Sequence, residues 1–137
     1  MNIALMAHDS KKELMVQFCT AYAGILSRHN LYATDTTGHQ VSEATGLHVH
    51  CFLTYAHGGN QQIGARIAFN EIDLVLFFND PTDPKTAGDV PYISRLCDGN
   101  NIPFASNLGT AEILVMGLAR GDLDWRNIVN PSTRPIV

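Results

Sequence analysis

The chain has 137 residues, of which 45% are hydrophobic and 16% charged, a composition typical of one compact domain and not of a disordered segment. Its formal net charge is −4 at pH 7 and its basic residues form no long run, which excludes the basic surface that nucleic-acid and membrane-surface binding require. We expect residues 1–137 to form a single domain whose affinity for any anion comes from a local site.

Short apolar runs alternate with segments of helical periodicity in the first half of the chain. Ser10 is a candidate N-cap for the first helix, and Gly46 is a candidate stop for the second. In chain order, the pattern predicts a strand over residues 2–7, a helix over 10–28, a strand over 31–34, a short helix over 39–45 and a strand over 47–53.

The second half continues the alternation, beginning with a helix that Gly58 and Gly59 open. The pattern then predicts a strand over residues 72–78, a Pro- and Thr-rich loop over 80–88, a helix around 90–97, a strand over 102–105 and a helix over 109–120. The tail from Asn130 carries two prolines, and we expect it to be loosely ordered.

The predicted strands are apolar on both faces and alternate with helices. This pattern is typical of an α/β domain in which helices cover a mostly parallel sheet. Ligands of such sheets bind beyond the carboxyl ends of the strands, so the segments that follow the strands are where we expect a functional site.

The segment after the first strand contains His8, Asp9 and Lys12. It offers a titratable imidazole, a carboxylate and a cation at the predicted edge of the sheet. A lysine in the first turn of a helix opposes the helix dipole unless an anion lies nearby, which favours an anion site. The alternative interpretation is an ordinary solvated helix start.

The segment after the second strand clusters hydroxyl groups around one carboxylate and ends in a glycine: Thr34, Asp35, Thr36, Thr37 and Gly38. Hydroxyls and backbone N–H groups at a helix start can hold a phosphate. The alternative interpretation is a simple N-cap without a ligand.

The segments after the third and fourth strands complete the same edge. Gly58 and Gly59 form a second backbone turn suited to an anion, and Asn79 and Asp80 follow the fourth strand. Four such segments at one edge predict a binding site for a small phosphorylated ligand.

Six histidines and three cysteines raise the question of a metal. His48 and His50 share one face of a predicted strand and His57 follows, but no cysteine or carboxylate completes a typical ligand spacing. We therefore predict no metal and no cofactor, with the cysteines as small apolar residues of a reducing compartment.

The chain shows no apolar run of the roughly 20 residues that cross a membrane, and its first apolar stretch is too short for a signal peptide. From these observations we predict a soluble protein of the cytoplasm that binds neither membrane nor nucleic acid.

Five ordered motifs resemble the methylglyoxal synthase family. They are Ile3-Ala4-Leu5-Met6-Ala7-His8-Asp9, Tyr32-Ala33-Thr34-Asp35-Thr36-Thr37-Gly38, Gly58-Gly59-Asn60-Gln61-Gln62-Ile63-Gly64-Ala65, Phe77-Phe78-Asn79-Asp80-Pro81 and Asn107-Leu108-Gly109-Thr110-Ala111-Glu112. The resemblance covers essentially the whole chain. It implies a flavodoxin-like, three-layer α/β sandwich with a mostly parallel five-stranded sheet, assembly as a homohexamer, and a lyase that eliminates phosphate from dihydroxyacetone phosphate.

The resemblance also assigns roles to residues. It implies phosphate binding by a lysine and three threonines, namely Lys12, Thr34, Thr36 and Thr37. It implies pocket or catalytic roles for His8, Asp9, Asp80 and Asp89. Arg126 matches an arginine of the family that reaches the phosphate of a neighbouring subunit.

The chain departs from the family pattern at the pocket. Asp35 replaces a glycine in the threonine loop, and Tyr55 falls where the family has Ser-Gly-Pro. Asn60 replaces the aspartate that acts as the family's base, and a carboxamide cannot accept a proton at neutral pH. The family's pocket histidine has no counterpart in residues 85–89.

Two functions follow. We favour a protein that binds a phosphorylated metabolite or nucleotide with weak or no turnover, in which Asp35 accepts hydrogen bonds from the ligand and Tyr55 stacks on a ring. The alternative is an active methylglyoxal synthase in which Asp9, Asp35 or Asp89 replaces the missing base at Asn60.

Overall fold

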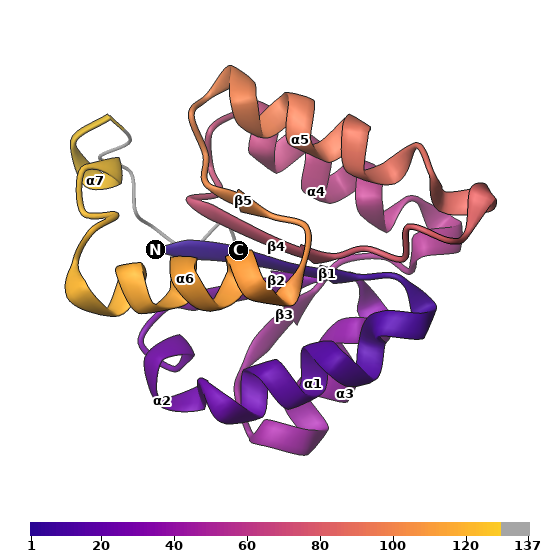
Figure 1. The fold of residues 1–137 in the computed structure, drawn as a ribbon, viewed down its shortest axis with the longest axis horizontal. Helices are drawn as coiled ribbons and strands as arrows, with labels where there is room; N and C mark the ends of the chain where they lie inside the picture. Colours follow the sequence, from indigo (N-terminus) through magenta and orange to yellow (C-terminus); the bar gives the residue numbers. More distant parts are fainter. Residues whose placement is uncertain (130–137) are drawn as a thin grey trace.

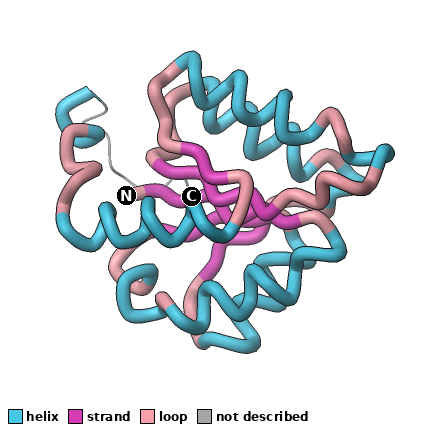
Figure 2. Tube along the Cα trace, viewed as in Figure 1, coloured by secondary structure: helices cyan, strands magenta, loops and turns pink. Residues whose placement is uncertain are grey.

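The computed structural model describes residues 1–129 and contains one five-stranded sheet between two layers of helices, as Figures 1 and 2 show. The strands are β1 (Asn2–Ala7), β2 (Asn30–Ala33), β3 (Val49–Cys51), β4 (Leu74–Phe78) and β5 (Phe104–Ala105). Their spatial order is β3-β2-β1-β4-β5 and every pair is parallel. The predicted α/β fold with a parallel sheet is confirmed.

Two helical layers cover the sheet, and Figure 1 shows them above and below it. One layer contains α1 (Lys12–Ala21), α2 (Ala23–Leu26), α3 (Asp35–Thr45) and α6 (Leu108–Arg120), and the other contains α4 (Gly59–Ala68) and α5 (Asp89–Gly99). Short helical pieces are η1 (Asp9–Lys11), η2 (Tyr55–His57), η3 (Pro84–Thr86) and α7 (Arg126–Val129).

Strand β1 shows why its run of apolar residues predicts a central strand. Ile3 and Leu5 pack into the core beneath α1, α3 and α6, while Ala4 and Met6 pack into the core beneath α4 and α5. Successive side chains of a strand point to opposite faces, so a strand covered on both faces must be apolar throughout.

The predicted helix over residues 10–28 is divided in the structure. Tyr22, with φ −110° and ψ 20°, separates α1 from α2. Ser10 is not an N-cap, because it lies within η1 and its hydroxyl donates to Asp80 Oδ2 at 2.7 Å. That bond ties the first helix to the loop after β4.

The second helix begins four residues earlier than predicted, at Asp35. Thr34 has extended backbone angles, and its carbonyl accepts the N–H of Gly38 at 2.9 Å, so the threonine-rich segment forms the first turn of α3. Gly46 ends α3 in the left-handed conformation, as predicted. Strand β3 is shorter than predicted at both ends, because the N–H of Leu47 donates to Thr45 Oγ1 at 3.1 Å and that of Leu53 to the side chain of Gln62 at 2.7 Å.

Because all strand pairs are parallel, the carboxyl ends of β1, β2, β3 and β4 lie at one edge of the sheet. None of the helices in residues 1–129 combines the length and apolar character needed to cross a membrane. The predicted loose tail from Asn130 lies outside the described residues.

Candidate functional site

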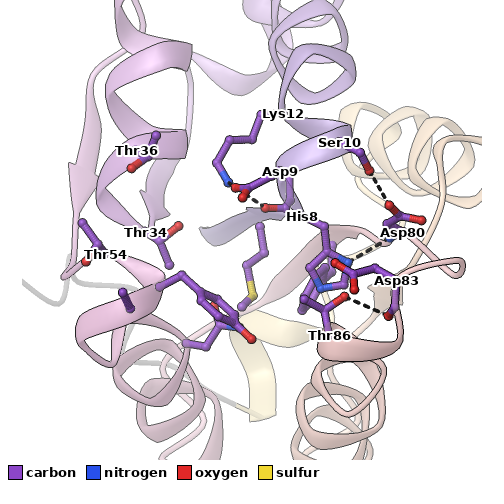
Figure 3. Close-up of a pocket in the computed structure, with 16 residues that line it drawn as sticks. His8, Asp9, Ser10, Lys12, Thr34, Thr36, Thr54, Asp80, Asp83 and Thr86 are labelled. Carbon is purple, nitrogen blue, oxygen red and sulfur yellow. Dashed lines mark hydrogen bonds and ion pairs between the residues drawn. The ribbon is translucent and has the colours of Figure 1, made fainter.

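A cavity of about 430 Å³ opens at the carboxyl ends of the strands (Figure 3). This is the size range of sites for small molecules. Eight residues predicted from the sequence line it: His8, Asp9, Lys12, Thr34, Thr36, Tyr55, Asn60 and Asp80. The predicted edge of the sheet is therefore the edge that carries the cavity.

Lys12 is the cation of this cavity. Its Nζ lies 2.6 Å from Asp9 Oδ1 and 3.4 Å from the carbonyl oxygen of Ala7, and its side chain is largely buried. The hydrogen bond and the charge of Lys12 lower the pKa of the exposed Asp9 carboxyl below its usual value. An anionic ligand would compete with Asp9 for the ammonium group.

His8 is buried beside the cavity in one tautomer. Its Nδ1 accepts the backbone N–H of Asp80 at 2.9 Å, so the ring proton belongs on Nε2, which donates to Asp89 Oδ2 at 3.0 Å. The ring packs edge-on against Phe77 at 5.1 Å. His8 is thus a neutral donor that orients Asp89.

Tyr55 gives Asp89 a second donor. The Tyr55 hydroxyl donates to Asp89 Oδ1 at 3.3 Å, and burial together with the Asp89 charge raises the pKa of Tyr55. The phenol therefore remains protonated. Both oxygens of Asp89 accept hydrogen bonds, which fixes this carboxylate at the start of α5.

Asp80 is also held in place. It accepts hydrogen bonds from Thr82 N–H (2.9 Å), Thr82 Oγ1 (2.6 Å) and Ser10 Oγ (2.7 Å). These hydrogen bonds lower the pKa of Asp80 to about 2, and the bond from the Thr82 side chain contributes most. Asp80 therefore acts as a fixed acceptor that joins two loops, because a carboxylate of such low pKa is a weak base at neutral pH.

The threonine segment contributes only part of the predicted set to the cavity. Thr34 and Thr36 line it, while Thr37 is buried and its Oγ1 has no hydrogen-bond partner among the described residues. Asp35 is not a lining residue, since its Oδ1 lies 3.1 Å from Nε2 of His39. The structure thus separates Asp35 from the hydroxyls that line the cavity.

The two glycines place Asn60. Gly58 adopts a left-handed conformation (φ 96°), and a Cβ on Gly59 would overlap the carbonyl oxygen of Leu53. This close approach lets α4 begin against the end of β3, where Asn60 is buried and lines the cavity. A carboxamide therefore lies where the resemblance places the family's base.

Arg126 does not reach the cavity. Its side chain is fully buried, and its guanidinium donates to the Asp73 carboxylate, to Asn70 Oδ1 at 2.7 Å and to two carbonyl oxygens, those of Ile72 and Asn100. Within one chain a buried carboxylate holds this cation, and the expectation that Arg126 reaches the phosphate of a neighbouring subunit stays a prediction.

The structure also brings in residues that the sequence analysis did not select. Ser10, Thr54, Asp83 and Thr86 line the cavity. Thr54 directly follows the predicted strand over residues 47–53, and Ser10 is next to the predicted site residue Asp9, so both could have been selected from the sequence. Asp83 and Thr86 lie in the Pro-rich loop, whose path the sequence does not determine.

The histidines considered for a metal do not gather. His50 packs against the rings of Tyr32 and Phe52, and His57 lies 2.7 Å from Thr54 Oγ1. Within residues 1–129 a different group of potential ligands comes together: Asp35, His39 and Cys51.

Comparisons with known proteins find one family. The profile of the MGS-like domain matches residues 14–106. The chain is 61% identical to a methylglyoxal synthase of Caldicellulosiruptor saccharolyticus over 132 residues, which cover 96% of this chain and 94% of that protein. It is 57% identical to a methylglyoxal synthase of Geobacillus thermodenitrificans over 131 residues, covering 95% and 91%.

A solved structure agrees with the sequence comparisons. The crystal structure of methylglyoxal synthase from Elizabethkingia anophelis superimposes with a TM-score of 0.74 at 39% identity, covering 83% of this chain and 76% of that one. The similarity therefore extends to the fold.

Proposed function

The chain belongs to the methylglyoxal synthase family, and on this premise we propose that it is a carbon–oxygen lyase that converts dihydroxyacetone phosphate into methylglyoxal and phosphate. High identity to relatives named methylglyoxal synthase supports turnover over the non-catalytic binding role that the sequence analysis favours. The observation that carries the proposal is one cavity lined by a cation, two hydroxyls and a carboxylate: Lys12, Thr34, Thr36 and Asp9.

The reaction requires a base and a stabilised leaving group. The base removes a proton from the hydroxymethyl carbon of the ketone, which leaves an enediolate. The C–O bond to phosphate then breaks, phosphate departs with the bonding electrons, and the resulting enol takes up a proton to become methylglyoxal. Lys12, Thr34 and Thr36 are suited to hold the phosphate, since an ammonium and hydroxyl groups stabilise its negative charge.

Asp9 is the base that the geometry favours in place of residue 60. The pKa of Asp9 is lowered chiefly because Lys12 holds its carboxylate. A phosphate that binds the Lys12 ammonium would weaken that pair and make Asp9 more basic beside the substrate. Asp89 has both oxygens engaged by donors and Asp35 pairs with His39, so neither offers a comparable group.

A second candidate function rests on Asn60. A carboxamide in the cavity where the family carries its base favours a protein that holds a triose phosphate, or a nucleotide-like phosphate, without converting it. The binding residues would be the same, so turnover separates the two functions.

The test is methylglyoxal formation from dihydroxyacetone phosphate by the wild type, Asp9→Asn and Asn60→Asp. We expect wild-type turnover of roughly 1–10³ s⁻¹ and a loss of about 10²–10⁴-fold in Asp9→Asn. Asp98→Asn, an exposed site on α5 outside the cavity, is the control. If the substrate raises Tm but the wild type forms no methylglyoxal, and Asn60→Asp restores it, the second function replaces the first.

We also propose that the chain assembles as a homohexamer in the cytoplasm, as the family resemblance implies. Exposed apolar side chains on α6 and α7, including Ile113 (71% exposed) and Ile128 (81%), support an interface on this side. Light scattering should give about six times the 15.0 kDa mass of one chain. A stable monomer at micromolar concentration would contradict the assembly.

A further inference from the structure

Asp35, His39 and Cys51 converge at the end of the sheet that carries the cavity. Each offers one potential ligand atom, and the three atoms all lie within 4.8 Å of one another. We propose that these three residues form a binding site for a divalent transition-metal ion of the zinc class. The site is separate from the residues that hold the phosphorylated ligand.

Two elements place the three ligands. Asp35 and His39 are four residues apart on α3, so they share one face of the helix, and Asp35 Oδ1 lies 3.1 Å from His39 Nε2. Cys51 is the last residue of β3 and pairs with Ala33 of β2, two residues before Asp35. In Figure 1, α3 lies beside β3, and the two elements are in contact.

Gly38 creates the space for the sulfur. A Cβ at this position would overlap Cys51 Sγ, so the glycine allows the thiol to lie against α3 in its present position. The sulfur therefore lies beside the helix that carries Asp35 and His39. The cluster of three residues is partly accessible to solvent, since Cys51 and Asp35 are half-buried and His39 is exposed.

The three donor types select the class of metal. Thiolate, imidazole and carboxylate are the common ligands of zinc, with bonds of about 2.0–2.3 Å. Hard cations such as Mg²⁺ and Ca²⁺ prefer oxygen ligands and would leave the sulfur and the imidazole unused. Three protein ligands leave a fourth position for water or another small donor.

A simpler explanation accounts for part of the cluster. Asp35 and His39 alone would form an ordinary ion pair between successive helical turns. In that explanation the Cys51 thiol only donates to the carbonyl oxygen of Val49 at 3.7 Å and takes no part in the pair, so metal binding by the thiol distinguishes the two. Burial, and secondarily the charge of Asp35, raises the pKa of Cys51 above its usual value, so metal binding must displace the thiol proton.

The experiment is titration of the reduced protein with Zn²⁺ alone, measured by calorimetry. We expect one ion per chain in the wild type. Cys51→Ser, His39→Gln and Asp35→Asn should each weaken binding by more than the roughly 10–100-fold that loss of an outer-shell partner causes. His48→Gln removes an exposed histidine just before β3 and should bind as the wild type does.

Co²⁺ gives a second readout that depends on the thiolate. The wild type should show the near-ultraviolet charge-transfer absorption of a cobalt–thiolate bond, and Cys51→Ser should lack it while keeping a folded circular-dichroism spectrum. The proposal is wrong if the wild type binds no Zn²⁺, if Cys51→Ser binds it as tightly as the wild type, or if the cobalt band is absent.

Discussion

Lys12 is the residue on which anion binding most directly depends. It stands at the first position of α1, where a positive charge opposes the helix dipole, and the exposed Asp9 is its partner there. We predict that phosphate-containing ligands raise the stability of the wild type, by about 2.7 kcal/mol at a hundred times their dissociation constant. Lys12→Ala should abolish this shift in Tm.

The control for this prediction is Lys11→Ala, which removes the neighbouring lysine that does not line the cavity. It should leave the ligand-induced shift in Tm unchanged. Equal shifts in the wild type and Lys12→Ala would move the anion site away from this end of the sheet.

The residues of the site show where prediction from sequence succeeds and where it stops. His8, Lys12 and Asn60 lie in the segments that follow strands, so their place at the edge of a parallel sheet could be predicted. Asp35 could not be placed, because its direction depends on α3 beginning at residue 35 and presenting it to His39. The pairing of Cys51 with these two is a long-range contact that no local pattern contains.

At the scale of elements, the contact between Gly59 and the end of β3 fixes the start of α4. A Cβ on Gly59 would overlap the carbonyl oxygen of Leu53 and crowd the methyl group of Thr34. We predict that Gly59→Ala lowers the free energy of unfolding by about 1–3 kcal/mol or more, since this is the usual cost of overpacking a filled site. The substitution should also displace Asn60 and Thr34 in the cavity.

The matched control is Gly99→Ala at the end of α5, where an added Cβ meets no atom within 4 Å. It should change the free energy of unfolding by no more than about 0.5 kcal/mol. Urea unfolding measures both variants. If Gly59→Ala were as stable as Gly99→Ala, the backbone approach at α4 would not be a constraint.

The existence of the elements was predictable, and their ends were less so. Apolar runs such as residues 72–78 identify the strands because burial on both faces requires them. The start of α3 at Asp35 was missed because a threonine-rich segment is typical of a turn, whereas here the extended Thr34 precedes the first helical turn. The division of the first helix at Tyr22 leaves no signal in the periodicity, since Ala23–Leu26 continues the helix directly.

At the scale of the whole molecule, His29 links the start of the chain to the turn before β2. Its Nδ1 lies 3.0 Å from the Met1 amino group, and burial, assisted by the nearby amino group and Arg28, lowers the pKa of His29 below its usual value. The unfolded state therefore binds the proton more readily than the folded state. The free energy of unfolding should fall as pH drops below the ordinary histidine pKa of about 6.5.

Urea unfolding between pH 7.5 and about 5 tests this. His29→Gln should flatten the pH dependence in that range, whereas His48→Gln, which removes an exposed histidine, should leave it unchanged. An identical slope in His29→Gln and the wild type would assign the dependence to another group.

Arg126 connects the end of the described chain to the sheet, and its role can be separated from ligand binding. The Asp73 carboxylate, just before β4, accepts from the Arg126 guanidinium at 3.2 Å and from the Asn2 N–H at 2.9 Å, and Arg126 and Asp73 are both almost wholly buried. Removing one partner of a buried pair leaves an uncompensated charge, so Arg126→Ala should lower the free energy of unfolding by about 3–5 kcal/mol.

The exposed pair Arg120–Asp122 provides the control, and Arg120→Ala should lower the free energy of unfolding by only about 0–1 kcal/mol. Adding Asp73→Asn to Arg126→Ala should recover part of the loss, because the unpaired carboxylate is then absent. The measurements are urea unfolding and the ligand-induced shift in Tm. A variant Arg126→Ala with wild-type stability but a lost ligand shift would return this arginine to the phosphate site that the family resemblance implies.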